Sequence, residues 1–160
     1  MQHEVHLHTF GYLHGAPPPG HITIDLRSHF RDPHISPELR HLTAHDEPVR
    51  AAVLATPGIP VLTEALTVMV LAYLAGPSAG PVTVAVGCQG GRHRAPTVGA
   101  QAAQTLAAGG VPVTLIHRDL ERPVVDRATS AEMSERGAGM LRAALGKDGP
   151  KFGPRGWSER

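Results

Sequence analysis

The sequence predicts an α/β fold, a layered sandwich with a small, mostly parallel sheet at its centre. Short alternating or apolar segments that are typical of strands recur at residues 4–10, 21–27, 82–86 and 111–117. Segments with helical patterns lie between the later ones, and strands that alternate with helices favour a parallel sheet. The run VTVAV at 82–86 is continuously apolar, which is typical of a central parallel strand covered on both faces.

The first part of the chain joins two predicted strands by polar connections. EVHLHTF at 4–10 alternates apolar and polar residues, which places Val5 and Leu7 on the inner face. The following FGYLHGAPPPG is predicted to be a loop, because its prolines and glycines interrupt regular structure. HITIDLR is the second strand and ends in polar Asp25 and Arg27, and residues 28–48 form a long connection of a kind that is more often functional than filler.

The middle of the chain carries three predicted helices. Two cover residues 49–58 and 59–76, and the second is apolar on nearly every face, so we expect it to be buried with Met69 and Tyr73 in the core. The third runs from the neighbourhood of Pro96 to the glycine pair at 109 and 110.

The end of the chain is expected to add one helix and a tail. Thr129 and Glu132 have the spacing of a capping box, which predicts a helix over residues 129–145. Residues 147–160 are Gly, Pro and charged residues, and we expect a disordered tail. The predicted organisation is therefore a single domain over 1–146 followed by the tail.

Composition excludes several classes of protein. In 160 residues, 41% hydrophobic and 18% charged residues are typical of a globular chain, and a net charge of +1 does not indicate a nucleic-acid binder. A single cysteine excludes an internal disulfide. No segment resembles a signal peptide or a membrane span, so we expect a cytoplasmic protein without membrane contact.

Eleven histidines raise the question of a metal site. His6 and His8 would project from one face of the first strand, where His3 or Glu4 could complete a zinc site. Histidines along a strand are more often surface or hydrogen-bonded groups, so we predict no metal and no cofactor.

The segment GCQGGRHR at 87–94 is the strongest candidate for a binding site. It follows a predicted strand and precedes a helix, and ligands of parallel sheets collect at this edge. Gly87, Gly90 and Gly91 allow the backbone to approach an anion closely, while amide groups of the first helical turn point towards it. Basic side chains add positive charge to this loop, which predicts a bound oxyanion, most naturally phosphate; they are Arg92, His93 and Arg94.

The same residues of the loop allow other interpretations. The chain contains neither G-x-x-x-x-G-K-[ST] nor G-x-G-x-x-G, which argues against a conventional nucleoside triphosphatase and a dinucleotide site. A solvated strand-to-helix turn is one alternative. Cys88 and Arg94 have the C-x5-R spacing of cysteine-dependent phosphatases. However, Ala95 stands where those enzymes usually carry Ser or Thr, and a lone cysteine is more often an inert packing residue.

Four segments together resemble the C-terminal domain of the RapZ/YvcJ family. GCQGGRHRAPTVG is similar to that family's G-C-T-G-G-[KR]-H-R-S-V, and FGYLHGAP is similar to its F-G-[FY]-[KR]-x-G-x-P. IDLRSHFRDPHISPELRHLTAHDEPV and HRDLER resemble its D-x-R and closing H-R-[DT] segments. The segments occur in the family's order and cover roughly residues 9–123.

The resemblance implies a ligand, partners and a set of site residues. In that family a P-loop domain precedes this one, so the present chain is expected to hold the second domain only, without nucleotide hydrolysis. The C-terminal domain binds a phosphorylated amino sugar, and enterobacterial members also bind a regulatory RNA. Gln89 and Ala95 replace the family's Thr and Ser. The implied ligand-binding residues are Asp25, Arg27, Cys88, Gln89, Gly90, Gly91, Arg92, His93, Arg94, His117 and Arg118.

The leading hypothesis is therefore a binding module rather than an enzyme. It would hold a phosphorylated small molecule at the 87–95 loop and act as a sensor or adapter. The first alternative is a phosphatase-like enzyme that uses Cys88 and Arg94. The second is an RNA-binding adapter, although Arg122 is followed by Pro123 where RNA-binding members have a basic cluster. A protein partner and a homodimer are further alternatives that the sequence leaves open.

Overall fold

The computed structural model describes residues 4–78 and 80–125, and its centre is one four-stranded sheet. The strands are β1 (Val5–Gly11), β2 (Ile22–Asp25), β3 (Val82–Cys88) and β4 (Val113–His117). Their order is β2-β3-β1-β4, and each neighbouring pair is parallel. The prediction of an α/β fold with a small, mostly parallel sheet is confirmed.

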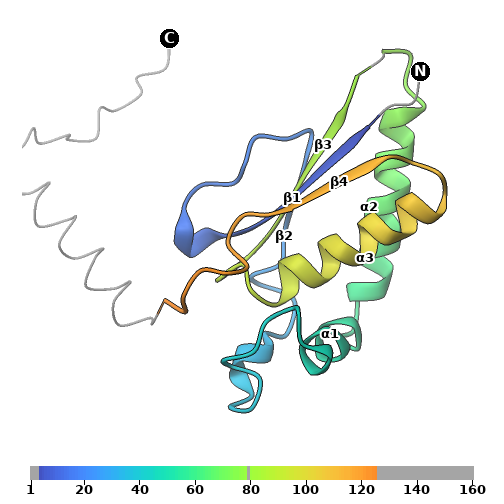
Figure 1. Cartoon of the computed structure of the whole chain (residues 1–160). Helices are drawn as coiled ribbons and strands as arrows, with labels where there is room; N and C mark the ends of the chain where they lie inside the picture. Colours follow the sequence, from blue (N-terminus) through green and yellow to red (C-terminus); the bar gives the residue numbers. More distant parts are fainter. Residues whose placement is uncertain (1–3, 79, 126–160) are drawn as a thin grey trace, which may run out of the picture. The chain divides into compact units, whose positions relative to one another are not determined.

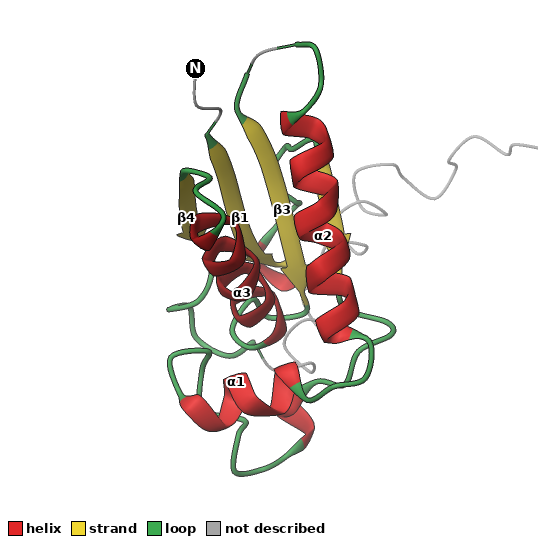
Figure 2. Cartoon of the chain, turned by 90° about the vertical axis from the view of Figure 1, so that its right-hand side faces the viewer, coloured by secondary structure: helices red, strands yellow, loops and turns green. Residues whose placement is uncertain are grey.

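Three α-helices accompany the sheet: α1 (Glu47–Leu54), α2 (Ile59–Leu74) and α3 (Arg94–Ala108). Helices α2 and α3 pack on the same face of the sheet (Figure 2), and α1 lies beyond the carboxyl ends of the strands (Figure 1). Two short 3₁₀ turns, η1 (Tyr12–His14) and η2 (Pro33–Ile35), occur in segments that were predicted to be irregular.

The core lies between the sheet and its helices. Val5 and Leu7 of β1 are fully buried on the helix side, as predicted. Parallel registration places Val82 and Val84 beside them, and both are buried. Alternate side chains of every strand therefore supply one apolar surface, and α3 packs closely enough on it that a Cβ at Gly99 would lie 2.4 Å from a methyl carbon of Thr9.

The expectation that β3 is covered on both faces is only half right. β3 lies inside the sheet, but in the described ranges no helix packs on the face opposite α2 and α3. Ala85 points to that face and is nevertheless 0% exposed. It lies in register between His8 and Thr23, whose longer side chains flank it. A short side chain inside a sheet therefore continues the apolar run without a second helical layer.

The expectation that α2 is buried on nearly every face is wrong. Ile59, Leu66 and Val70 pack into the core, but the opposite side of the helix is exposed, although α1, α3 and β3 all contact α2. Met69 and Tyr73, which were expected in the core, are among its exposed residues. The exposed fractions are 69% for Val61, 65% for Val68, 41% for Met69, 44% for Leu71 and 47% for Tyr73.

No single helix in the described part of the chain has the length and apolar composition to cross a membrane. Helices α1 and α2 pass such a test only when taken together, and they are bent by 84° at the break between them. The predicted helix at 129–145, the predicted tail at 147–160 and the domain boundary at 146 lie outside the described residues.

Candidate anion site at the carboxyl edge of the sheet

The loop that joins β3 to α3 packs directly against the end of β1. A Cβ built on Gly11 would lie 2.5 Å from the carbonyl carbon of Gly90, so only glycine fits where these two backbones meet. Gly91 has a φ of 74°, in the left-handed region, and a Cβ built there would lie 2.7 Å from the amide nitrogen of Gly11 and 2.9 Å from the Cβ of Asp119. The two glycines thus fix the loop onto the end of β1.

Gly90 marks the open side of this loop. A Cβ built there would meet nothing within 4 Å, in contrast to Gly11 and Gly91. Gln89 is half-buried, and its carbonyl oxygen accepts a hydrogen bond of 3.0 Å from the amide of Leu13. The outer surface of the loop at Gln89 and Gly90 is therefore the part that a ligand can reach.

Both Nη atoms of Arg94 donate hydrogen bonds to other residues of the protein. Its side chain is buried, with 3% of the residue exposed. Nη1 donates to the carbonyl oxygens of Leu26 at 2.7 Å and Phe30 at 2.9 Å, and Nη2 donates to Oδ2 of Asp32 at 2.6 Å. Arg94 therefore holds the segment after β2 against the loop.

His93 and Asp32 complete this internal network. Nε2 of His93 lies 2.9 Å from the carbonyl oxygen of Leu42, and Nδ1 lies 3.4 Å from Oδ1 of Asp32. Burial opposes ionisation of Asp32, but the hydrogen bond to His93 and the charge of Arg94 outweigh it and lower the pKa to about 2. The carboxylate of Asp32 thus contacts both Arg94 and His93, two residues that the sequence assigned to a ligand.

Cys88 lies at the base of the loop and is buried. Burial raises the pKa of its thiol, although the amides of Ala95 and Gly91 and the charge of Arg94 act in the opposite direction. The sulfur is thus held as a buried thiol beneath the loop.

A second group of predicted residues lies on the open face of the sheet. Arg27 pairs with both carboxylate oxygens of Asp25 and stacks on Tyr12, with its guanidinium carbon 3.5 Å from the ring centroid. Tyr12 contacts Phe10 edge to face at 4.8 Å, and Arg118 lies 5.3 Å from the Phe10 centroid. Gly87 makes room for both rings, since a Cβ there would lie 2.4 Å from Phe10.

A third group of residues surrounds Asp119, whose side chain is fully buried. Its Oδ2 accepts hydrogen bonds from the amide of Gly11 at 2.8 Å and from Nε of Arg118 at 2.9 Å. Nε of Arg122 lies 3.1 Å from Oδ1, and Nη1 of Arg92 donates to the carbonyl oxygen of Arg122. Burial opposes ionisation of Asp119, yet the bonds from Arg118 and Gly11 lower its pKa.

His117 does not join either group. It lies on the helix side of β4, where Nδ1 is 2.7 Å from Oγ1 of Thr9. Burial lowers the pKa of His117, and the charge of His45 adds to this effect while Glu121 opposes it. Arg118, the next residue, turns instead to Gly11 and Ala16, whose carbonyl oxygens accept its Nη hydrogens.

Comparison with known proteins places this arrangement in a family. The family model of the RapZ C-terminal domain matches residues 3–121, about three quarters of the chain. The chain belongs to the RapZ C-terminal domain family. The resemblance inferred from the loop and its flanking segments is thereby confirmed.

Relatives of this RapZ C-terminal domain carry the name nucleotide-binding protein. The one from Thermobifida fusca is 41% identical over 117 residues, which are 71% of this chain and 40% of that protein. Those from Alkalilimnicola ehrlichii and Sphingopyxis alaskensis are 36% and 37% identical over 71% of this chain, which corresponds to 40% and 36% of their lengths. The chain thus spans about two fifths of the length of these relatives.

The sequence did not predict the contacts of three residues that organise this RapZ C-terminal domain. Tyr12 carries the stacked Arg27, Asp32 neutralises Arg94, and Asp119 ties β1 to the segment after β4. Each lies in a segment that carried the resemblance, FGYLHGAP, the long connection or HRDLER. An aromatic or acidic residue beside the predicted basic ones was the available signal, because a buried guanidinium requires a partner.

The histidines of β1 do not form a metal site in the described residues. Nε2 of His6 lies 3.4 Å from Glu4, and Oγ1 of Thr114 donates to the other oxygen of that carboxylate. Residues 4–78 and 80–125 contain no group of three or more His, Cys, Asp or Glu side chains that could hold a metal ion. His3 lies outside the described residues.

Proposed function

We propose that this domain is a non-catalytic binding module that holds a phosphorylated small molecule of the sugar-phosphate kind and acts as a sensor or adapter. The observation that carries the proposal is the open side of the loop at Gln89 and Gly90. Two arginines contact residues close to the loop, since Arg27 stacks on Tyr12 and Arg118 donates to the carbonyl oxygen of Gly11. Gly11 and Leu13, the two neighbours of Tyr12 in the chain, both contact the loop: the amide of Leu13 donates to the carbonyl oxygen of Gln89, and Gly11 packs against Gly90. Tyr12 and the arginines near it are thereby held close to the loop. A glycine with open space above it lets backbone amides approach a phosphate closely.

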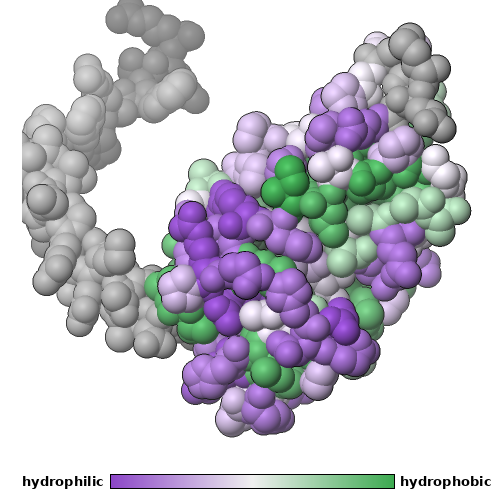
Figure 3. Space-filling view, in the orientation of Figure 1, coloured by the Kyte–Doolittle hydropathy of each residue, from purple (hydrophilic) through white to green (hydrophobic). Residues whose placement is uncertain are grey.

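The charge at this edge supports an anionic ligand. Arginines outnumber the aspartates that pair with them. Asp25 pairs with Arg27, Asp32 with Arg94, and Asp119 with both Arg118 and Arg122. The guanidinium group of Arg92 donates only to backbone carbonyl oxygens. Glu121 pairs with His45. Figure 3 shows hydrophilic residues gathered over the carboxyl end of the strands and the segment after β4. An excess of positive charge beside the open side of the loop favours an oxyanion.

Within this proposal the basic residues divide into two roles. Arg94 and His93 shape the loop by binding Asp32 and backbone carbonyl oxygens. We expect Arg27, whose side chain is 41% exposed, to pair with the phosphate, and we expect Asp25 and the hydroxyl of Tyr12 to form hydrogen bonds with sugar groups. The proposal therefore expects the ligand to contact the outer side of the loop rather than Arg94 or His93.

The same geometry argues against the phosphatase alternative. A thiolate nucleophile requires a lowered thiol pKa and access to substrate, whereas burial of Cys88 raises its pKa. Both Nη atoms of Arg94 already donate to the protein. For the RNA-binding alternative, no observation on the described residues favours a nucleic acid over a small molecule.

The name of the relatives, nucleotide-binding protein, makes a nucleotide the alternative ligand to be tested. A nucleotide is itself a phosphorylated small molecule, but this chain lacks G-x-x-x-x-G-K-[ST] and spans only two fifths of those proteins. The proposal therefore favours a sugar phosphate, and a nucleotide monophosphate is the comparison ligand.

Isothermal titration calorimetry with a phosphorylated amino sugar, its unphosphorylated parent and a nucleotide monophosphate tests this proposal. We expect binding of the sugar phosphate only, and at least a tenfold loss in Gly90→Ala, because the new methyl group keeps phosphate away from the loop amides. Gly90→Ala should still fold, since its Cβ meets nothing. Gly80→Ala, at the opposite end of β3, is the matched control. Equal affinity in Gly90→Ala and wild type, or no binding of any phosphorylated compound, would contradict the proposal.

A further inference from the structure

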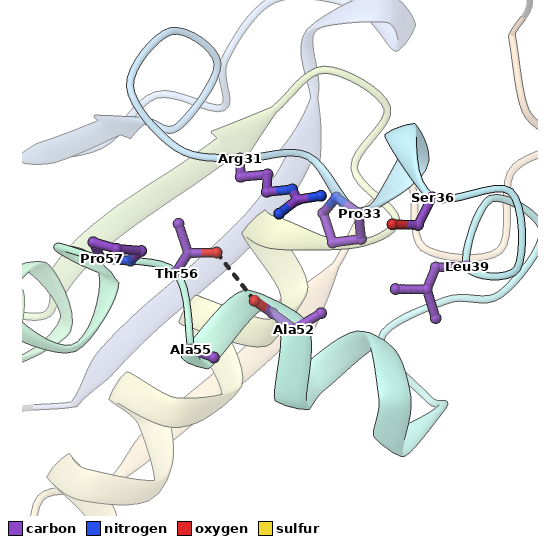
Figure 4. Close-up of a pocket in the computed structure, with 8 residues that line it drawn as sticks. All are labelled: Arg31, Pro33, Ser36, Leu39, Ala52, Ala55, Thr56 and Pro57. Carbon is purple, nitrogen blue, oxygen red and sulfur yellow. Dashed lines mark hydrogen bonds between the residues drawn. The ribbon is translucent and has the colours of Figure 1, made fainter.

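A pocket separate from the loop lies between the segment after β2 and the end of α1. Its volume is about 320 Å³, and its walls are mostly apolar. In Figure 4 the residues from 31 to 39 form one side and those of α1 and the turn after it form the other. The residues that line it are Arg31, Pro33, Ser36, Leu39, Ala52, Ala55, Thr56 and Pro57.

Arg31 differs from the other arginines of the described ranges. Each of the others forms a hydrogen bond or an ion pair, as Arg40 does with the carbonyl oxygen of His34 and Arg122 does with Asp119. Arg31 lies in the wall of the pocket and forms no ion pair or hydrogen bond with any described residue. A free guanidinium beside an apolar surface is the arrangement that recognises an anionic group on an apolar molecule.

Apart from Arg31, the polar side chains that line the pocket are the hydroxyl groups of Thr56 and Ser36. Oγ1 of Thr56 donates to the carbonyl oxygen of Ala52 at 3.0 Å, which leaves the hydroxyl oxygen as an acceptor (Figure 4). The hydroxyl of Ser36 lies on the same side of the pocket as Arg31. One cation and one hydroxyl can satisfy a single carboxylate, whereas Pro33, Leu39 and Pro57 offer only apolar contacts.

We propose that this pocket is a second binding site, for a compact organic carboxylate with an apolar body of about one ring. Its volume lies at the lower end of the range for small-molecule sites, about 300 to 1,000 Å³, which favours a small compound over a peptide segment. A single guanidinium favours a monocarboxylate over a phosphate, for which the loop offers several basic groups.

The pocket is joined to the loop through the neighbours of Arg31 in the chain. Arg94 binds the carbonyl oxygen of Phe30 and the carboxylate of Asp32, so the residues on both sides of Arg31 are fixed to the start of α3. A ligand that draws Arg31 into the pocket therefore acts on the segment that Arg94 holds. We expect the occupied pocket to change affinity at the loop; this coupling rests on the proposed function, whereas the pocket itself does not.

Benzoate is the probe for this site, and benzamide is its neutral control. Chemical shifts of backbone amides are followed by NMR as each compound is added to the chain. We expect saturable shifts at residues 31–39 and 52–57 with benzoate, and roughly fivefold weaker binding of benzamide, because only benzoate pairs with the guanidinium. In Arg31→Gln the two compounds should bind equally, and in Ala52→Leu neither should bind because the side chain fills the pocket.

Arg40→Gln is the matched control, since Arg40 belongs to the same segment but does not line the pocket. It should leave the affinity for benzoate unchanged. Equal binding of benzoate and benzamide to the wild type, unchanged discrimination in Arg31→Gln, or shifts that map away from the pocket would overturn the proposal. Benzoate binding is read without any phosphorylated ligand, so failure of the loop proposal leaves this test intact, and failure here leaves the loop proposal intact.

Discussion

Arginine side chains near the carboxyl edge differ in what their guanidinium groups contact. Arg94 is buried and bonded to Asp32 and three backbone carbonyl oxygens, so it organises the fold. Arg27 is partly exposed and stacks on Tyr12, and Arg31 forms no ion pair or hydrogen bond with the residues that the structure describes. Residue type alone therefore does not define a binding residue; the partners already present decide which donors remain for a ligand.

Replacing Asp32 by Asn tests the internal role of Arg94. The change removes the counter-charge of a guanidinium that is 3% exposed, although the amide oxygen can still accept a hydrogen bond. We expect a loss of about 1–3 kcal/mol in the free energy of unfolding at pH 7, measured by urea denaturation. Asp25→Asn is the control: its partner Arg27 is largely solvated, so the loss should be about 0–1 kcal/mol. Equal losses in the two variants would show that Arg94 is solvated.

The position of the candidate site could be predicted from the sequence, whereas the contacts between its side chains could not. A strand followed by glycines and basic residues predicted a loop at the carboxyl edge, and Gly87, Gly91 and Arg94 indeed lie there. The pairing of Arg94 with Asp32 joins residues 62 positions apart. Such a contact depends on how the long connection folds back, and no local pattern encodes that path. Tyr12 under Arg27 was missed for the same reason.

At the scale of elements, local sequence patterns predicted which strands and helices form, but not which of their faces are buried. All four strands and three helices were expected from alternation, apolar runs and the positions of Gly and Pro. Helix α2 shows where this reasoning fails, because it is apolar on both sides while only one side packs on the sheet. A composition that is apolar all round predicts burial, yet the number of neighbours is set by the tertiary arrangement.

Substitutions on the two sides of α2 should differ in effect. Val70 is fully buried, so Val70→Ala should cost about 1–3 kcal/mol of unfolding free energy through lost packing. Val68 lies on the open side, and Val68→Lys should change stability by no more than about 0.5 kcal/mol. Thermal and urea unfolding of the two variants provide the comparison. A loss in Val68→Lys as large as that in Val70→Ala would mean that the open side of α2 is covered in solution.

At the scale of the whole molecule, the titrating groups predict how stability depends on pH. Burial lowers the pKa of His117 from 6.5, so the folded state favours its neutral form. That contribution is present above pH 6.5 and is lost as the pH falls below it. The pKa of Asp32 falls from 3.8 to about 2, so its contribution is present above about pH 4 and is lost as the pH falls towards 2. Acid should therefore destabilise the protein in two separate windows.

Urea unfolding at a series of pH values from 8 to about 2.5 measures both windows. Between pH 4 and 2 the shift of Asp32 alone corresponds to about 2 kcal/mol, and the lowered pKa values of Asp25 and Asp119 add to the same step. Asp32→Asn should reduce this lower step and leave the upper one unchanged, whereas His117→Gln should reduce the upper step and leave the lower one unchanged. The two steps are independent because His117 lies on the helix side of β4 and Asp32 binds Arg94 and His93 beside the loop. An unchanged lower step in Asp32→Asn would mean that the carboxylate does not carry the charge of the Arg94 network, and the assignment of Arg94 to the fold rather than to the ligand would then fail.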